Sequence, residues 1–234
     1  MIRTYIAPRY RLQLQLILRF ITDLRKGYFF RYARRSCRVI DRKHDISISQ
    51  ALKPNDDKLH NLLLARRAIE ETIILPNEIF SFWKIVGSPS LRNGFRSSRS
   101  IVGNEIQNTI GGGLCQLSGM IYYVSLLAGL EIVERHSHSI DIYDSTTRFA
   151  PLGSDATLVY GYKDLKVRNT LTCPIKFMFD FEKETLGAKL FSEKEVTRRT
   201  VKFENTKLDR AEVMVTTLIN GTIFDRSVYK TVTA

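Results

Sequence analysis

The chain has 234 residues, 44% of them hydrophobic, which is enough to bury one sizeable core. Its net charge of +12 is unevenly distributed: residues 1–43 hold twelve Lys or Arg and two Asp, and residues 44–234 carry only the remaining +2. A nucleic-acid-binding face across the fold is therefore not expected. The three cysteines are an odd number with wide gaps, and the four histidines are not spaced with them as zinc ligands, which excludes a disulfide framework and predicts no metal site.

Residues 1–55 are predicted to form a basic, partly helical N-terminal arm ahead of one domain over residues 56–234. In RLQLQLILRFITDL only seven residues separate the two arginines, far fewer than the ~20 apolar residues of a membrane span. The arm also lacks the small-residue cleavage site of a signal peptide, so a cytoplasmic location is expected. Two interpretations of residues 1–43 stay open: a basic helix packed on the core through its Leu and Ile side chains, or an amphipathic segment on the inner face of an anionic membrane. Nucleic acid is not an expected partner.

Two helices are predicted in the first part of the domain. DDKLHNLLLARRAIEETII (56–74) places apolar residues in helical order after two aspartates that suit the helix dipole, and Pro76-Asn77 ends it. The following EIFSFWKIVG is predicted as a short strand, and residues 88–113 as a long surface loop with one short strand at 100–107. From Leu114 the nearly all-apolar LCQLSGMIYYVSLLAGL predicts a helix that is buried on most sides.

The chain after Gly129 is predicted to be rich in β-strands. EIVERHSHS has the alternating character of a strand, and Asn220-Gly221 is a strong signal for a two-residue hairpin. The expected fold class is α+β, with two main helices packed on a largely antiparallel β-sheet, a basic helical N-terminal arm and a C-terminal β-hairpin extension. The other predicted strands are ATLVYGY, LKVRNT, PIKFMFDFE, LGAKLFSE, TVKFENT, EVMVTTLI and TIFDRSVYKT.

The segment GGGLCQ places three glycines directly before a cysteine at a predicted helix start. Glycine tolerates positive φ and close approach of other groups, so Gly111, Gly112 and Gly113 are expected to leave room for a substrate carbonyl. Cys115 in the first helical turn would lie near unpaired N–H groups and the positive end of the helix dipole, where a thiolate is stabilised. The same N–H groups, with the side chain of Gln116, would hold a developing oxyanion. Cys115 is therefore a candidate nucleophile, and a small buried core residue is the alternative.

A nucleophilic cysteine needs a base, and ERHSHS after the helix offers His136 and His138. Alternation along a strand places both imidazoles on one face, and a strand that runs back along the helix brings them toward its N-terminus. Asp155 or Asp141 is then expected to orient the imidazole. Half-exposed surface histidines are the alternative reading.

Other candidate residues are read as structural or solvated. Cys37 in the basic arm and Cys173 lack the setting of a reactive thiol. Arg92, Arg96 and Arg99 on the long loop would suit a carboxylate or a phosphate, but a solvated loop is the preferred interpretation.

Five segments within residues 77–169 carry a family resemblance: NEIFSFWKIVG, GGGLCQLS, GLEIVERHSHS, PLGSDATLVYG and DLKVRN. With them the chain resembles, most strongly over residues 62–193, the VanW family of bacterial proteins, which are associated with some vancomycin-resistance gene clusters. Some VanW domains in envelope-anchored proteins look like cysteine-dependent L,D-transpeptidases, which cross-link peptidoglycan stem peptides. The resemblance therefore implies a link to cell-wall metabolism.

Carried over to this sequence, the family cysteine is Cys115, the histidine of the ERxxH segment is His138 and the aspartate of the G-x-D-A-T segment is Asp155. The resemblance implies acyl transfer, in which the thiolate attacks a peptide carbonyl, the imidazole moves the proton and the carboxylate orients the imidazole. His136 is the second candidate base. The glycine turn, the adjacent glutamine and Ser118 are the expected substrate contacts.

One departure matters, because the envelope enzymes carry a signal or anchor and none is apparent here. In this the chain resembles the short, leaderless form of the family. A cytoplasmic protein cannot cross-link a wall outside the membrane, so the expected partner is a cytoplasmic or lipid-linked wall precursor. Two functions stay open: cysteine-dependent acyl transfer or hydrolysis on a peptidoglycan-type peptide, and non-catalytic binding of a wall precursor or of a partner at the inner membrane surface. Neither function requires a cofactor or a metal.

Overall fold

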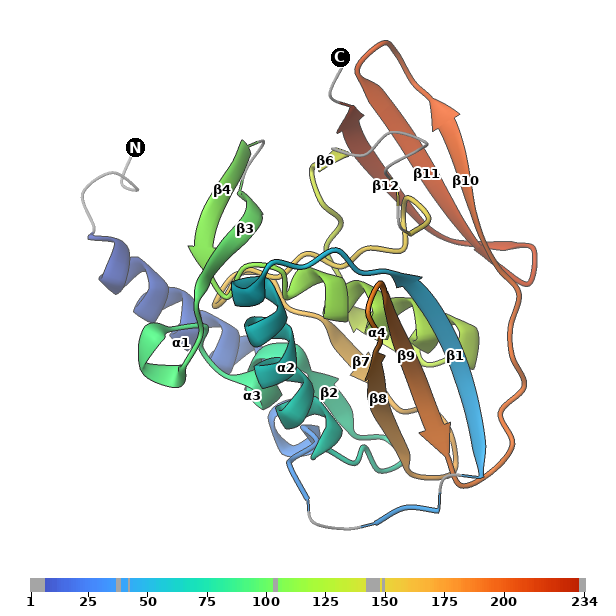
Figure 1. Cartoon of the computed structure of the whole chain (residues 1–234). Coiled ribbons are helices and arrows are strands. Elements are labelled where there is room, and N and C mark those ends of the chain that lie inside the picture. The colour runs from blue at the N-terminus through green and yellow to red at the C-terminus, as the bar shows by residue number, and fades with distance from the viewer. Residues whose placement is uncertain are drawn as a thin grey trace.

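The computed structural model describes residues 7–36, 39–41, 43–102, 105–141, 148 and 150–231, so Cys37 lies outside the described residues. It has the predicted α+β organisation, with helices packed against small sheets (Figure 1). The helices are α1 (Pro8–Arg25), the short 3-10 helix η2 (Phe29–Arg31), α2 (Asp56–Glu70), α3 (Phe82–Val86), the 3-10 helix η3 (Leu91–Asn93) and α4 (Cys115–Ala128). The strands are β1 (His44–Ala51), β2 (Ile79–Ser81), β3 (Ser97–Val102), β4 (Glu105–Ile110), β5 (Glu131–Glu134), β6 (Ile140–Asp141), β7 (Lys166–Arg168), β8 (Ile175–Phe181), β9 (Thr185–Ser192), β10 (Val201–Lys207), β11 (Glu212–Ile219) and β12 (Thr222–Thr231).

The described strands form four sheets that are largely antiparallel, as predicted. One sheet has the order β1-β9-β8 and another the order β2-β7-β5, and every pair in both is antiparallel. β3 and β4 form a two-stranded hairpin. The C-terminal sheet has the order β10-β11-β12-β6, in which only β12 and β6 run parallel. Figure 1 shows this sheet projecting from the body of the molecule.

Two helices and the β1-β9-β8 sheet enclose the hydrophobic core. α4 packs against β9 and β1, and nearly all its side chains are buried, as its apolar composition predicts. α2 packs against β8 and begins at Asn55, whose side chain accepts a hydrogen bond from the N–H of Lys58 at 2.8 Å. Asp56 and Asp57 then lie in the first turn, where their charge favours the helix dipole. The core therefore fixes α4 on several sides and leaves its N-terminus at one end of the sheet.

Strand β1 belongs to this core although it precedes residue 56, the expected start of the domain. It pairs with β9 from His44 to Ala51, and Ile46 and the following Leu52 are buried. The N-terminal arm expected over residues 1–55 thus contains a strand that completes the β1-β9-β8 sheet. Within the described residues, no helix combines the length and the apolar character needed to cross a membrane.

One predicted helix is shorter than expected, and one predicted strand is instead a short strand followed by a short helix. The helix expected over residues 56–74 ends at Glu70, and Ile74 instead forms an isolated bridge with Ile175. The β-branched run that follows Glu70 suits this extended pairing better than a helix. EIFSFWKIVG was predicted as one strand but contains β2 and then α3, because the Ser81 side chain caps a new helix by accepting a hydrogen bond from the N–H of Lys84.

The prediction of a long loop with one strand at 100–107 is also wrong. Residues 97–110 form the β3–β4 hairpin, in which Ser97 pairs with Ile110 and Val102 with Glu105. ATLVYGY, predicted as a strand, lies outside the named strands and makes only a local bridge between Val159 and Lys163. By contrast, the C-terminal hairpin is confirmed: Asn220 and Gly221 both have positive φ, the backbone conformation that a tight two-residue hairpin turn requires.

Candidate active site

The three glycines before Cys115 make close contacts with other parts of the protein. A Cβ at Gly112 would lie 2.1 Å from the carbonyl oxygen of Ser98 in β3, and a Cβ at Gly113 would lie 2.6 Å from Cγ of Lys58. A Cβ at Gly111 would lie 2.6 Å from Cβ of Pro89. The space that the glycines leave is therefore filled by protein and not, as expected, kept open for a substrate carbonyl. The glycines let the turn pack tightly between β3 and α2, which fixes the start of α4.

We expect Gly112→Ala to lower the free energy of unfolding by about 1–3 kcal/mol, because the added methyl group would force the turn away from the β3 backbone. Urea unfolding followed by circular dichroism measures this loss. Gly187→Ala in β9 is the matched control, since its new Cβ would meet Asp180 at an ordinary 3.5 Å. Equal unfolding midpoints for the two variants would show that the turn does not depend on this contact.

Cys115 is the first residue of α4, as predicted, and its side chain is partly exposed. The sulfur accepts a hydrogen bond from the backbone N–H of Leu158, with an N···S distance of 3.4 Å. In the described part of the chain, the backbone N–H groups of Gly113, Leu114 and Cys115 donate no hydrogen bond to the protein. Unpaired N–H groups at a helix N-terminus are suited to hold negative charge, either on the sulfur or on the oxygen of a carbonyl under attack.

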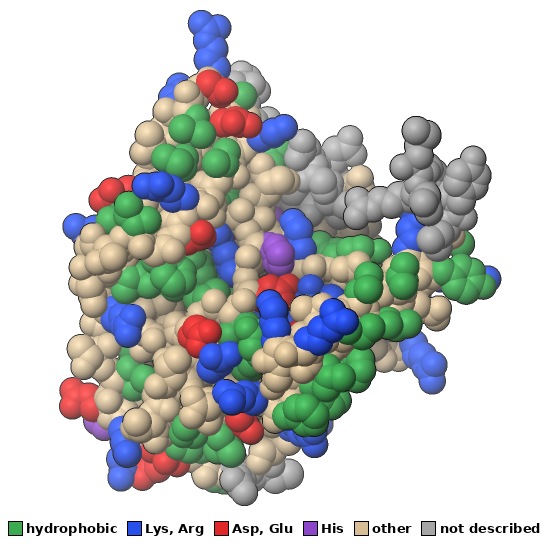
Figure 2. All heavy atoms as spheres, turned by 180° about the vertical axis from the view of Figure 1, so that it is seen from behind, with side chains coloured by type: hydrophobic (Ala, Val, Ile, Leu, Met, Phe, Trp, Pro, Cys, Tyr) green, Lys and Arg blue, Asp and Glu red, His purple; other side chains and the backbone are tan. Residues whose placement is uncertain are grey.

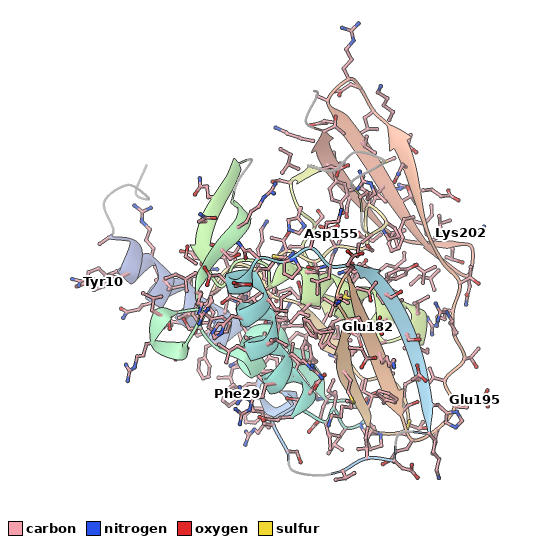
Figure 3. The ribbon with its side chains drawn as sticks, viewed as in Figure 1. Tyr10, Phe29, Asp155, Glu182, Glu195 and Lys202 are labelled. Carbon is pink, nitrogen blue, oxygen red and sulfur yellow. The ribbon has the colours of Figure 1, made fainter. Side chains whose placement is uncertain are left out.

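His138 and Asp155 lie together beside this helix end. The Nδ1 atom of His138 is 2.6 Å from Oδ2 of Asp155, and the backbone N–H of His138 donates to the same oxygen at 2.7 Å. With Nδ1 committed to the carboxylate, Nε2 is the ring atom left to face Cys115, which lies close enough to raise the pKa of His138. Asp155 lies below the C-terminal sheet (Figure 3). The structure thus brings the three residues into the order thiol, imidazole, carboxylate.

Electrostatics favour the charged form of this histidine. Burial lowers the pKa of His138, but hydrogen bonds to Asp155 and Cys115, together with their negative charges, raise it to about 10. Burial raises the pKa of Asp155, but the bond to His138 and the charge of Arg135 outweigh it and hold the pKa well below its usual range. At neutral pH the imidazole therefore carries a proton beside the Asp155 carboxylate, and it can serve the Cys115 thiol as an acid–base partner.

Arg135 holds the far side of the Asp155 carboxylate. Its Nη2 lies 3.1 Å from Oδ1 of Asp155, and its Nε donates to the Asp155 backbone carbonyl at 2.8 Å. Oδ1 also accepts a hydrogen bond of 2.5 Å from the hydroxyl of Tyr229 in β12. The guanidinium reaches further into β12, to Asp225 at 3.2 Å and to the Ser227 hydroxyl at 2.5 Å. Both oxygens of Asp155 are thus fully engaged, so the carboxylate has one orientation.

The second candidate base faces away from this cluster. The Nε2–H of His136 donates to Oε1 of the Glu134 carboxylate at 3.1 Å, and the His136 side chain is 37% exposed. The expected strand alternation does not apply, because β5 ends at Glu134 and the His136 carbonyl accepts a hydrogen bond from the N–H of Thr157. Asp141, the other proposed orienting residue, pairs with Arg148. His138 is the one of the two histidines that meets Cys115.

Two expected substrate contacts serve packing in this structure. The amide nitrogen of Gln116 donates to the carbonyl of Ala51 at 3.2 Å, and its buried Oε1 accepts no hydrogen bond from the described residues. Ser118 is fully buried and donates to the carbonyl of Ala156 at 2.5 Å. Both side chains tie α4 to neighbouring segments. The unpaired backbone N–H groups before and at Cys115 are the better oxyanion donors.

Two cations lie near the glycine turn. The Lys58 side chain passes over Gly113, and burial together with the charge of Arg99 lowers the pKa of Lys58. Among the described residues, neither Lys58 nor Arg99 makes an ion pair, whereas Arg96 pairs with Asp57 at 3.3 Å. One of the loop arginines is thus neutralised locally, and another joins Lys58 as an unpaired positive group beside the start of α4.

Two surface pockets lie away from Cys115. A pocket of about 470 Å³ is lined by side chains of α2 and β8. A second, of about 350 Å³, is lined by α1 and by residues around β5, among them His136 and Glu134. Cys115 lines neither of them. The candidate site is defined by its side-chain chemistry and by the partly exposed sulfur.

Comparison with known proteins places these residues within a region that matches a known family. The family described as VanW like protein matches residues 57–191. The uncharacterized protein YoaR of Bacillus subtilis (strain 168) is 36% identical over 121 residues, which cover 52% of this chain and 38% of that protein. The vancomycin B-type resistance protein VanW of Enterococcus faecalis (strain ATCC 700802 / V583) is 29% identical over 140 residues, 60% of this chain and 51% of that protein. The chain thus spans about half or less of the length of these relatives, and no solved structure matches it.

Proposed function

Because this chain belongs to the VanW-like protein family, we propose that Cys115 is the nucleophile of an acyl transfer or hydrolysis on a peptidoglycan-type peptide. One observation carries the proposal: the sulfur at the α4 N-terminus, the His138 imidazole and the Asp155 carboxylate form a connected series. This is the constellation of an activated cysteine with a base and an orienting acid. All three residues lie inside the segment that matches the family.

Each group has a defined part in the proposed reaction. The Cys115 thiolate attacks the peptide carbonyl carbon, a C–S bond forms, and the carbonyl electron pair moves to the oxygen, which the N–H groups at the start of α4 hold. Collapse of this intermediate breaks the C–N bond, and the leaving amine takes the proton of the His138 imidazolium. An amine acceptor or water then attacks the thioester and gives its proton to His138. Loss of the C–S bond regenerates the thiolate.

The substrate class is supported by a relative and by local charge. The relative from Enterococcus faecalis is named a vancomycin B-type resistance protein, which points to cell-wall peptides and their precursors. Such peptides carry carboxylates, and Lys58 with Arg99 supplies positive charge beside the glycine turn. A free or lipid-linked wall precursor is therefore the proposed acyl donor. If the thiol proves inert, the same site would act as a non-catalytic receptor for such a precursor.

The test is the rate of alkylation of each cysteine by iodoacetamide as a function of pH, read by mass spectrometry. We expect Cys115 to react fastest, because its sulfur is partly exposed and lies beside a protonated imidazole. His138→Gln and Asp155→Asn should slow the reaction at neutral pH by about tenfold, and the latter should also lower the pKa of His138 by removing a charge and a hydrogen bond that raise it.

Cys173 is the internal control, since it is buried with 3% of its surface exposed and should react only when the protein unfolds. Folded protein in which Cys115 stays inert at every pH while Cys37 is alkylated would contradict a nucleophilic role. That result would leave the receptor function in its place.

A further inference from the structure

Helix α1 has its polarity reversed relative to an ordinary surface helix. A surface helix normally turns its apolar side chains toward the core and its charged side chains toward water. In α1 the exposed side chains include seven large apolar residues, each at least 37% exposed: Tyr10, Leu14, Ile17, Leu18, Phe20, Ile21 and Leu24. At 100° per residue these positions cover one continuous sector of about 160° of the helix surface. We call these seven residues the apolar face of α1.

Two charged residues of α1, Arg19 and Asp23, explain the reversal, because they point inward. Arg19 makes two hydrogen bonds to the Glu134 carboxylate, at 2.7 and 2.8 Å, and another to the carbonyl of Tyr162. Asp23 is buried and forms an ion pair with Lys166 at 2.7 Å. These contacts, with Leu12 packed on Gly161, fix the rotation of the helix about its axis. The apolar face is therefore held outward by buried ion pairs.

The apolar face continues into the next segment. Phe20 contacts Phe29 edge to face, with ring centroids 5.1 Å apart, and Phe29 contacts Phe30, which is 77% exposed. In Figure 2, which views the molecule from behind, the corresponding area is a broad group of hydrophobic side chains bordered by Lys and Arg. Tyr10 points away from the body of the protein (Figure 3). A contiguous apolar surface of this kind marks a docking site.

Charge indicates what docks there. Arg25, Arg31 and Arg34 are exposed and make no ion pair with any described residue. Asp23 is the one acid within residues 7–36, and it is buried. A second copy of the chain would bring these arginines against their own equivalents, which is unfavourable. An anionic lipid surface would accept both the apolar side chains and the surrounding cations.

We propose that the apolar face of α1 lies in the headgroup region of an anionic membrane, with the arginines after it on lipid phosphates. The helix then lies along the surface, and its buried ion pairs with β5 and β7 fix the orientation of the whole domain relative to the bilayer. Bound in this way, the domain would meet lipid-linked molecules at the membrane. The proposal does not depend on the chemistry of Cys115.

The experiment is co-sedimentation of the full chain with vesicles of phosphatidylcholine alone or of phosphatidylcholine mixed with phosphatidylglycerol. We expect binding to the mixed vesicles only, with release at high salt. The triple variant Leu14→Ser, Ile17→Ser and Leu18→Ser should lose at least about tenfold in partitioning. The triple variant Arg25→Gln, Arg31→Gln and Arg34→Gln should lose about fivefold for each cation removed.

Matched controls carry the same changes elsewhere. One control triple replaces exposed apolar residues outside α1: Leu91→Ser, Leu208→Ser and Ile223→Ser. The other removes three exposed cations: Lys202→Gln, Lys207→Gln and Arg210→Gln. Both control variants should bind vesicles like the parent protein. Absence of binding to either vesicle overturns the proposal. So does a dimer in analytical ultracentrifugation that the Ile17→Ser change dissociates, because the face would then serve a second copy. Unchanged alkylation of Cys115 in all variants shows that the fold is retained.

Discussion

Replacing Cys115 with serine should abolish alkylation at the start of α4 and lower turnover of a stem peptide by at least about 10³-fold. The hydroxyl would occupy the same place beside His138, but an alcohol is not ionised by a neighbouring imidazolium as a thiol is. The measurement is mass-spectrometric detection of the transferred or hydrolysed product from a synthetic stem peptide, offered with and without an amine acceptor. A thioester adduct on the parent protein, absent from the variant, would identify the intermediate directly.

The control for this substitution is Cys173→Ala, which changes a buried thiol far from the site in sequence and should leave turnover unaltered. Equal turnover by Cys115→Ser and the parent would remove Cys115 from the mechanism. The pH dependence gives a second check, because turnover needs the imidazolium as acid while alkylation does not. We expect turnover to fall as the pH rises through about 10, where His138 loses its proton, with no matching fall in alkylation.

The same pKa affects stability, with a definite sign. The pKa of His138 is higher in the folded protein, about 10, than the ordinary value of 6.5. The proton on His138 therefore stabilises the fold fully below pH ~6.5, and this stabilisation is lost as the pH rises through about 10. The expected alkaline loss of turnover and the alkaline loss of stability thus have one origin, the deprotonation of an imidazole held against the Asp155 carboxylate.

Short-range patterns in the sequence were enough to predict the start of α4 and the turn before the last strand. An apolar run after three glycines predicts a helix that begins near Leu114, one residue before the observed start, and Asn220-Gly221 predicts a hairpin, because both depend on a few consecutive residues. The β3–β4 hairpin carried a similar signal, since Gly103-Asn104 separates two strand-like runs, but the density of polar residues favoured a loop. The turn signal was thus present in the sequence, but the polar composition of the segment was given more weight.

Contacts between distant segments could not be predicted in the same way. Tyr229 bonds Asp155 across 74 residues, and no periodicity in the sequence relates the two. Arg135 lies inside the ERxxH segment, so the sequence shows a cation close to His138. Its partners in β12 are set by the order of strands in the sheet, which the sequence does not show. The outward apolar face of α1 also depends on tertiary ion pairs, which is why a helix packed through its Leu and Ile side chains was an equally good reading.

Arg135 is the residue whose loss should cost the fold most. Its side chain is 6% exposed and joins Asp155, the loop carbonyl of Gly153 and the C-terminal strand β12, all through charge-assisted hydrogen bonds. Arg135→Met keeps most of the side-chain volume but removes one of the two cations, Arg135 and His138, that face the largely buried Asp155 carboxylate. Removing one partner of a buried ion pair costs about 3–5 kcal/mol, and we expect a loss of that size in urea unfolding.

A double-mutant cycle separates the ion pair from general damage. Adding Asp155→Asn to Arg135→Met removes the uncompensated charge, so the double variant should be less destabilised than the sum of the two single variants. Arg168→Met is the matched control: its partner Glu131 is 45% exposed, and an ion pair so open to water should contribute about 1 kcal/mol or less. Additive losses in the cycle, or an Arg135→Met variant as stable as Arg168→Met, would show that β12 does not hold Asp155 through this arginine. The Tyr229 hydroxyl would then be the remaining link between Asp155 and the C-terminal sheet, which lies outside the family match.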